Sequence, residues 1–318
     1  MKSRITAILL AAVFVVVLTA ACSDGESERQ PGDSARALFI TQPGAAQMFI
    51  RDEVNRLQDE FDIEVDLVSG DNLAAVEIRN IERAVTEGYD VLFINSSDIT
   101  AVIPALTSAK EDGLIIGLFS SALPQGYSGE NVIDFFCGSD FFLSGMTAGE
   151  FVSGQFPYGA NAVEIGIPTE DALQVQLHNG FSAGKANNID LLATENAAGW
   201  DASNARQIME DFLSQFGNDI NIVWCHWDEG ADGVIKAAQA AGRNDIFIIG
   251  VGGIGVGYRN VRDGLQALSV GQNYTNMIKR SLQNARALLD GGTVPQVNII
   301  PMDLITPDTI DNFNFPDS

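Results

Sequence analysis

Histidine is scarce in this 318-residue chain, which contains only His178 and His226. Metal catalysis therefore has few ligands to use. His226, Asp228 and Glu229 stand close together in the sequence, but a carboxylate cluster at a loop is usually only solvated. A catalytic triad would also have to use one of the two histidines. The sequence therefore predicts that the chain is not an enzyme and uses no metal and no cofactor.

Basic residues are also few. The chain contains 18 lysines and arginines and 42 acidic residues, and its formal net charge is −24. A chain of this charge repels the phosphate backbone, so we expect no nucleic-acid partner. Direct attraction to anionic lipid is disfavoured for the same reason. The acidity favours solubility or a salty habitat and does not by itself indicate a function.

The chain contains three cysteines, and two of them, Cys137 and Cys225, lie inside apolar runs typical of strands. We expect two buried thiols at these positions. A location outside the cytoplasm would also allow a disulfide without requiring one.

Long apolar runs are limited to the N-terminus, where Lys2 and Arg4 precede an uncharged stretch over residues 5–18. This stretch is shorter than the ~20 residues of a membrane-spanning helix, and small residues follow it where a signal peptidase would cut. The sequence thus predicts a signal peptide over 1–21. The ending Thr19-Ala20-Ala21-Cys22 resembles a bacterial lipobox, with Thr19 in place of the usual leucine, and implies that Cys22 carries lipid. The alternative is an ordinary cysteine beside a plain cleavage site.

Residues 23–35 contain no large apolar side chain and cannot bury enough surface to fold. We therefore expect 22–35 to be a lipid-anchored flexible linker. The domain that follows would work in the cell envelope, in the periplasm or on the outer face of the cytoplasmic membrane.

The remaining ~280 residues alternate between short apolar runs and segments of helical period. Nearly continuous apolar runs are typical of strands covered on both faces. Between them, Ile50, Val54 and Leu57 share one helical face, and Asp201 and Ser203 are placed to start a helix. The pattern predicts an α/β fold of two doubly wound parallel sheets. The expected strands are 37–40, 63–68, 91–94, 114–119, 132–137, 163–167, 189–194, 221–225, 246–251 and 267–272.

Several phrases of the sequence resemble the type I periplasmic binding proteins, particularly the ribose- and galactose-binding branch. They are the stretches 88–106, 137–151, 197–205 and 228–242, and the similarity extends from about residue 36 to the end of the chain. The resemblance implies two lobes joined by a three-strand hinge and a ligand cleft between them. The N-terminal lobe would be 36–137 plus 273–297, and the C-terminal lobe 138–272 plus 298–318.

Positions that match the family's ligand contacts fall at the ends of strands. Aromatic rings there would stack on the C–H faces of a sugar, and polar groups would fix its hydroxyls. Core packing is the alternative for the aromatic residues, and helix capping is the alternative for Asp140 and Asp228. The predicted ligand contacts are Gln42, Gln47, Phe49, Phe119, Ser120, Asp140, Trp200, His226, Trp227, Asp228 and Gln272.

The departures from the ribose-binding pattern concern charge. Phe119-Ser120 stands where ribose binders have an Asp-Arg pair, Trp227 and Gly252 replace an Asn and an Asp, and no arginine occurs between 170 and 186. We therefore expect a neutral ligand with a larger apolar face than ribose, such as a deoxysugar, a glycoside or a nucleoside.

The run GVGGIG at 250–255 matches the dinucleotide-binding pattern G-x-G-x-x-G. It follows a late strand of the second unit and does not open a first βαβ unit, so we expect no nucleotide there. Its glycines would instead allow a tight turn or a close approach of the backbone.

The combined signals predict a solute-binding lipoprotein that captures a sugar or sugar-like molecule and delivers it to the permease and ATPase of an ABC-type importer. Two alternatives keep the fold. The protein could be a ligand sensor for a chemoreceptor or a sensor kinase, or it could bind a nucleoside.

Overall fold

The computed structural model describes residues 34–120, 132–167, 172–313 and 315. The predicted signal peptide 1–21, the lipidation site Cys22 and most of the predicted linker lie outside these residues. Ala35, the last residue of the predicted linker, is the first residue of strand β1. In the part of the chain that is described, no helix has the length and apolar content that a membrane crossing requires.

The first α/β unit is built from the N-terminal half of the chain together with α9 (Tyr274–Leu289) and β11, and it contains a parallel six-stranded sheet, sheet A, in the order β11-β5-β4-β3-β1-β2. Apolar side chains alternate between its faces because successive residues of a strand point in opposite directions. Leu38 and Ile40 of β1 enter one core and Ala37 and Phe39 enter the other. The strands are β1 Ala35–Thr41, β2 Ile63–Ser69, β3 Val91–Ile94, β4 Ile115–Phe119, β5 Phe135–Gly138 and β11 Val297–Ile299.

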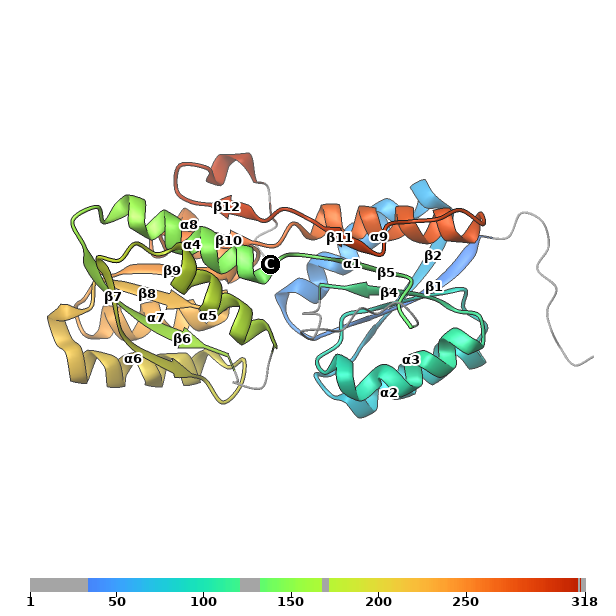
Figure 1. Cartoon of the computed structure of the whole chain (residues 1–318), viewed down its shortest axis with the longest axis horizontal. Helices are drawn as coiled ribbons and strands as arrows, with labels where there is room; N and C mark the ends of the chain where they lie inside the picture. The colour runs from blue at the N-terminus through green and yellow to red at the C-terminus, as the bar shows by residue number, and fades with distance from the viewer. Residues whose placement is uncertain (1–33, 121–131, 168–171, 314, 316–318) are drawn as a thin grey trace, which may run out of the picture. The chain divides into compact units, whose positions relative to one another are not determined.

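Helices cover both faces of sheet A, as Figure 1 shows. Helices α1 (Ala45–Leu57) and α9 (Tyr274–Leu289) pack on one face, and α2 (Ala74–Thr86) and α3 (Ile99–Glu111) pack on the other. A 3₁₀ turn over Gln58–Phe61 follows α1.

The second α/β unit contains sheet B, in the order β12-β10-β9-β8-β6-β7. Helices α4 and α5 cover one face, and α6 and α7 cover the other. Asp201 caps α6 by accepting a hydrogen bond from the Ser203 amide, as the sequence predicts. The elements are α4 Phe141–Gln155, β6 Ala160–Gly166, α5 Ala172–Gly184, β7 Ile189–Asn196, α6 Ala202–Phe216, β8 Ile222–Cys225, α7 Asp228–Ala240, β9 Phe247–Gly252, α8 Val256–Arg262, β10 Leu268–Gly271 and β12 Asp303–Ile305, with 3₁₀ turns Gly217–Asp219 and Ile310–Asn312.

The chain passes between the two sheets three times: after β5, after β10 and between β11 and β12. The predicted lobe boundary at 297/298 falls within β11, which pairs with β5 as far as Ile299. One strand pair departs from the predicted parallel arrangement, because β12 runs antiparallel to β10. The reason is that β10 leads the chain out of this unit and β12 brings it back.

Helices α4 and α5 touch through glycines. A methyl group added at Gly145 or Gly149 would overlap the backbone of α5 or of the residue after it, and one added at Gly180 or Gly184 would overlap the backbone of α4. The two helices are therefore closer together than larger side chains would allow.

The two described thiols are free, and both are buried, in agreement with the expected state. Cys137 in β5 donates a hydrogen bond to the Met277 carbonyl, and Cys225 in β8 donates to the Trp227 carbonyl. Burial raises the pKa of Cys137 to about 11, which keeps the thiol protonated.

Candidate functional site

A pocket of about 150 Å³ lies at the carboxyl ends of strands β8, β9 and β10. This is the end of a parallel sheet at which ligands bind in open α/β folds. The first unit contributes Ala46 from α1, and Tyr274 comes from the start of α9. The pocket is lined by Ala46, Phe141, Leu173, Trp200, His226, Trp227, Asp228, Glu229, Val251, Gly252, Ile254, Gln272 and Tyr274. We call it the β8–β10 pocket.

Trp200 and Trp227 form an aromatic pair in this pocket, with ring centroids 6.2 Å apart in an edge-to-face arrangement. The Trp227 indole N–H donates to the Trp200 carbonyl over 3.2 Å. Trp227 is 3% exposed and belongs to the core between sheet B and helices α6 and α7, whereas Trp200 is 47% exposed. Trp200 therefore offers the more accessible ring to a ligand, while Trp227 also supports the core.

Asp228 begins helix α7, and protein donors engage both of its carboxylate oxygens. Its Oδ1 accepts from Gln266 over 2.8 Å, and its Oδ2 accepts from the Gly253 amide and the Ser269 hydroxyl, both over 2.7 Å. Burial raises the pKa of Asp228, and these hydrogen bonds oppose that effect. The carboxylate therefore holds together the ends of β9, β10 and α7. Its predicted contact with ligand stays a prediction.

The glycines of the run 250–255 allow the backbone to come close to the Asp228 carboxylate. Gly252 and Gly253 have φ angles of 144° and 88°, which favour glycine. A methyl group at Gly252 or Gly257 would collide with the Asp228 carboxylate. The run turns the backbone around a carboxylate at the end of β9.

A charged cluster that the sequence does not predict lies behind His226. Glu164, on β6, is fully buried; its Oε1 lies 2.7 Å from His226 Nε2 and its Oε2 lies 2.7 Å from His178 Nδ1. The Thr194 hydroxyl donates to the same Oε2 over 3.0 Å. Burial would raise the pKa of Glu164, but the two histidine hydrogen bonds lower it to about 2, so this carboxylate is ionised.

An ionised Glu164 fixes the proton of His226. Because the carboxylate can only accept, His226 Nε2 must carry a hydrogen. Burial lowers the pKa of His226 and so favours the neutral ring, while Glu164 opposes this effect. Its Nδ1 then carries a lone pair, and no described residue donates to it. His226 thus presents an unused hydrogen-bond acceptor at a residue that lines the pocket.

Gln272 and Ser120 join the two units next to the pocket. The Ser120 hydroxyl donates to Gln272 Oε1 over 2.6 Å, and the backbone N–H of Gln272 donates to the Gly252 carbonyl over 3.0 Å. Ser120 has a φ angle of 48°, an uncommon value for a residue other than glycine. Tyr274 lies beside them, and burial raises the pKa of its hydroxyl.

The predicted contacts of the first unit do not line the β8–β10 pocket. Gln42 donates to the Glu77 carboxylate over 2.8 Å and to the Asn95 carbonyl over 2.7 Å, and it accepts from the Asn72 amide over 2.8 Å. Gln47 donates to the Thr41 hydroxyl. These two amides brace the loops after β1 and β3, and their role in binding stays a prediction.

Phe49, Phe119 and Asp140 are also absent from the residues that line this pocket. Phe119 is fully buried in the core of sheet A, with its ring centroid 5.0 Å from that of Phe39. Phe49 is partly buried beside Tyr274. Asp140 caps α4 by accepting from the Leu143 amide, which is the capping role that the sequence offers as the alternative.

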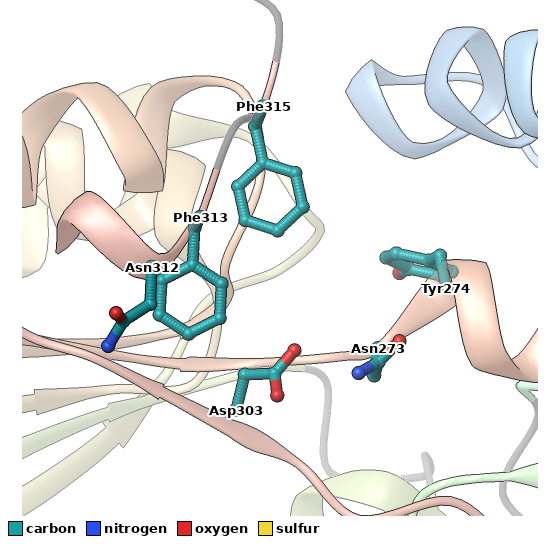
Figure 2. Close-up of a pocket in the computed structure, with 6 residues that line it drawn as sticks. All are labelled: Asn273, Tyr274, Asp303, Asn312, Phe313 and Phe315. Carbon is teal, nitrogen blue, oxygen red and sulfur yellow. The ribbon is translucent and has the colours of Figure 1, made fainter. Parts of the chain in front are cut away.

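A second pocket of about 280 Å³ lies beside the crossing that leads into α9. Figure 2 shows the rings of Phe313 and Phe315 on one side, Asn273 and Tyr274 on the other, and the Asp303 carboxylate from β12 between them. Desolvation raises the pKa of Asp303, and a hydrogen bond with Asn273 opposes it. Tyr274 lines both pockets.

Two features associated with catalysis, a metal site and a serine-nucleophile elbow, do not occur in the described residues. Within the described residues, no three His, Cys, Asp or Glu side chains gather as a metal site. The sequence contains one Gly-x-Ser-x-Gly stretch at 180–184, but it ends helix α5 and does not sit on a strand-to-helix elbow.

Comparisons with known proteins agree with this geometry. The family model described as "Periplasmic binding protein domain" matches residues 39–293. The ribose import binding protein of Escherichia coli is 24% identical over 246 residues, covering 77% of this chain and 81% of that protein.

Two solved structures share the fold. A periplasmic solute binding protein of an ABC transporter from Actinobacillus succinogenes, with bound D-allose, has a TM-score of 0.81 at 17% identity and covers 88% of this chain and 100% of its own. The fructose-binding periplasmic domain of a hybrid two-component system has a TM-score of 0.77 at 19% identity, with coverages of 88% and 92%.

Proposed function

Because the chain belongs to the periplasmic binding protein domain family, we propose that it is an extracytoplasmic solute-binding protein that captures a sugar or sugar-like molecule and delivers it to an ABC-type importer. The observation that carries the proposal is the β8–β10 pocket, where aromatic and polar side chains meet at the carboxyl ends of three strands. The family is one of binding proteins, which agrees with the expectation that the chain is not an enzyme.

The pocket has the chemistry of a polyol site. The half-exposed ring of Trp200 suits the apolar C–H face of a sugar, and the T-shaped contact with Trp227 holds it in place. The His226 Nδ1 acceptor suits a ligand hydroxyl, and Gln272 contributes a further polar group to the lining of the same pocket.

The chain outside the pocket supports capture and delivery. Three crossings join the two α/β units, which suits a hinge that closes on a ligand. We keep the predicted lobes, 36–137 plus 273–297 and 138–272 plus 298–318. The N-terminal sequence supports export and a lipid anchor at Cys22, which would hold the protein beside its permease and ATPase in the cell envelope.

The test is thermal melting of the full chain, purified in mild detergent, against sugars, deoxysugars, polyols, nucleosides and amino acids. A ligand at about a hundred times its dissociation constant stabilises the fold by about 2.7 kcal/mol, which raises the melting temperature by a few degrees. A shift confined to sugars or polyols supports the proposal, and a shift confined to nucleosides supports that alternative ligand. A cooperative melt that no compound shifts overturns the ligand claim.

A sensory role is the second candidate, because the fructose-binding domain of a two-component system shares this fold. The two roles differ in the partner that the ligand-loaded protein engages. Ligand-dependent stimulation of ATP hydrolysis by a reconstituted importer supports delivery. Stimulation of a sensor kinase or a chemoreceptor in its place supports sensing.

A further inference from the structure

The charged residues that line the β8–β10 pocket are all acidic. Its lining contains two carboxylates, Asp228 and Glu229, and none of the described lining residues is a lysine or an arginine. A ligand in this pocket therefore meets negative charge without an opposing base from these residues.

The two carboxylates differ in what they already bind. Asp228 is buried and accepts hydrogen bonds from Gly253, Gln266 and Ser269. Glu229 is exposed and, among the described residues, makes no ion pair and accepts no hydrogen bond from another residue. Glu229 is thus the carboxylate that remains available to a ligand.

The surroundings of Glu229 are acidic. Although part of the Glu229 side chain reaches solvent, the surrounding protein desolvates its carboxylate and thereby raises its pKa, and the charges of Asp228 and Asp232 raise the pKa further. Lys236 lies on the same helix, but its ammonium pairs with Asp232 over 2.6 Å. The N-terminus of α7 offers Glu229 a partial positive charge, which is weaker than a full counter-ion.

The rest of the wall suits a group rich in donors. His226 offers a lone pair on Nδ1 and no free N–H. An ammonium group has three donors and no acceptor, whereas a hydroxyl brings one donor. The rings of Trp200 and Tyr274 line the same pocket, and aromatic faces attract cations.

We propose that the ligand is an aminated polyol, an amino sugar or aminocyclitol, whose ammonium group binds Glu229 against the aromatic wall. This inference rests on the proposed function and replaces the expected neutral ligand with a cationic one of the same class. Glu229 then acts as a specificity-determining residue that strengthens the binding of cationic ligands and weakens the binding of acidic sugars.

The experiment uses matched ligands and isothermal titration calorimetry on the full chain in mild detergent. The probes are D-glucose, D-galactose and D-mannose, myo-inositol, the corresponding amino compounds, and the N-acetyl derivatives, which keep the nitrogen but remove its charge. We expect the amine of at least one set to bind about tenfold more tightly than its neutral and N-acetyl partners. Added salt should weaken the amine more than the neutral partner.

Two variants assign the preference. Glu229→Gln keeps the size of the side chain and removes its charge, so it should abolish the preference for the amine while leaving the neutral partner within about threefold. Glu150→Gln removes an exposed carboxylate on α4 outside the pocket and should leave the preference intact. A preference that survives Glu229→Gln assigns it to another group and overturns the inference.

The outcomes separate the inference from the proposed function. If the amine binds no more tightly than its neutral partner in every set that binds, the inference is overturned and the solute-binding function stands. Glu229 then only places a negative charge at the N-terminus of α7. Failure of every probe, neutral and aminated, to bind a protein that melts cooperatively overturns both.

Discussion

Each of the two α/β units contains a fully buried glutamate, and the two are used differently. Glu77, on α2 of the first unit, accepts hydrogen bonds from Gln42, Ser96 and Ser97, none of which titrates. Glu164, on β6 of the second unit, accepts from two histidines and a threonine. The first network only ties loops together, whereas the second couples a pocket residue to the binding of protons.

The networks also differ in how closed they are to water. Ser97 is exposed and Gln42 and Ser96 are partly exposed, so water can replace every donor of Glu77. In the Glu164 network Thr194 is exposed and His178 is partly exposed, but His226 is 1% exposed and cannot be solvated in the same way. The unit that supplies most of the β8–β10 pocket is therefore the unit whose polar core is more costly to disturb.

Loss of the carboxylates should give the largest difference between the units. Glu164→Ala leaves the buried N–H of His226 without an acceptor and should cost about 3 kcal/mol of unfolding free energy. Glu77→Ala should cost about 1–2 kcal/mol, because water reaches its partners. Urea denaturation of both variants measures the two values. Equal losses would show that exposure of the partners does not set the cost.

Acid should remove the contribution of Glu164. Its pKa is about 2 in the folded protein against an ordinary value of 4.5, so the ionised carboxylate stabilises the fold above about pH 4.5 and this is lost as the pH falls towards 2. The amount is about 3 kcal/mol, at about 1.4 kcal/mol per pKa unit. The stability gap between wild type and Glu164→Gln should shrink over this range. A constant gap contradicts the prediction.

The aromatic side chains of the two units should differ in ligand binding. Trp200→Ala removes the exposed ring of the β8–β10 pocket and should weaken binding about tenfold, or about 1.4 kcal/mol. Phe49→Ala removes a ring outside this pocket and should weaken binding less than about threefold. Calorimetric titration with the ligand identified by melting compares them. The reverse order would place the ligand against the first unit.

Substitution of the two histidines should have the smallest effects on the unfolding free energy, and the pH dependence of the two effects should have opposite signs. The pKa of His178 is raised, so its pairing with Glu164 stabilises the fold fully below about pH 6.5 and is lost as the pH rises through the folded value. The pKa of His226 is lowered, so its burial costs stability as the pH falls below about 6.5. His178→Asn should therefore cost more at pH 5 than at pH 8, and His226→Asn should cost less.

Urea midpoints measured across this pH range test the signs for both histidines. Ser96→Ala, in the Glu77 network, is the matched control and should cost the same throughout, because a serine does not titrate. A parallel pH dependence for the two histidine variants would contradict the assignment.

Much of the fold could be predicted because it depends on local patterns. Apolar runs and helical periods place β3 at 91–94 and the start of α6 beside its cap Asp201. The antiparallel β12 could not be predicted in this way, because its direction follows from the return of the chain between the units. Strand direction after a long excursion is a property of the whole path.

The site was less accessible to prediction, because its networks join distant positions. Glu164 and His226 are 62 residues apart, and Gln42 and Glu77 are 35 apart. A signal for both glutamates exists in the sequence. Glu164 is the one charged residue in the run VEIGI, and Glu77 falls on the apolar face of its helix, so each required buried partners. The partners themselves follow only from the three-dimensional structure.

The glycine contact between α4 and α5 also limits how this protein can diversify. Phe141 begins α4 and Leu173 lies in α5, and both line the β8–β10 pocket. Because any larger residue at the four contact glycines forces the helices apart, substitutions there would move both walls at once. New ligand preferences are therefore more accessible through changes at Trp200, Glu229 or Gln272, whose replacement leaves the helix pair undisturbed.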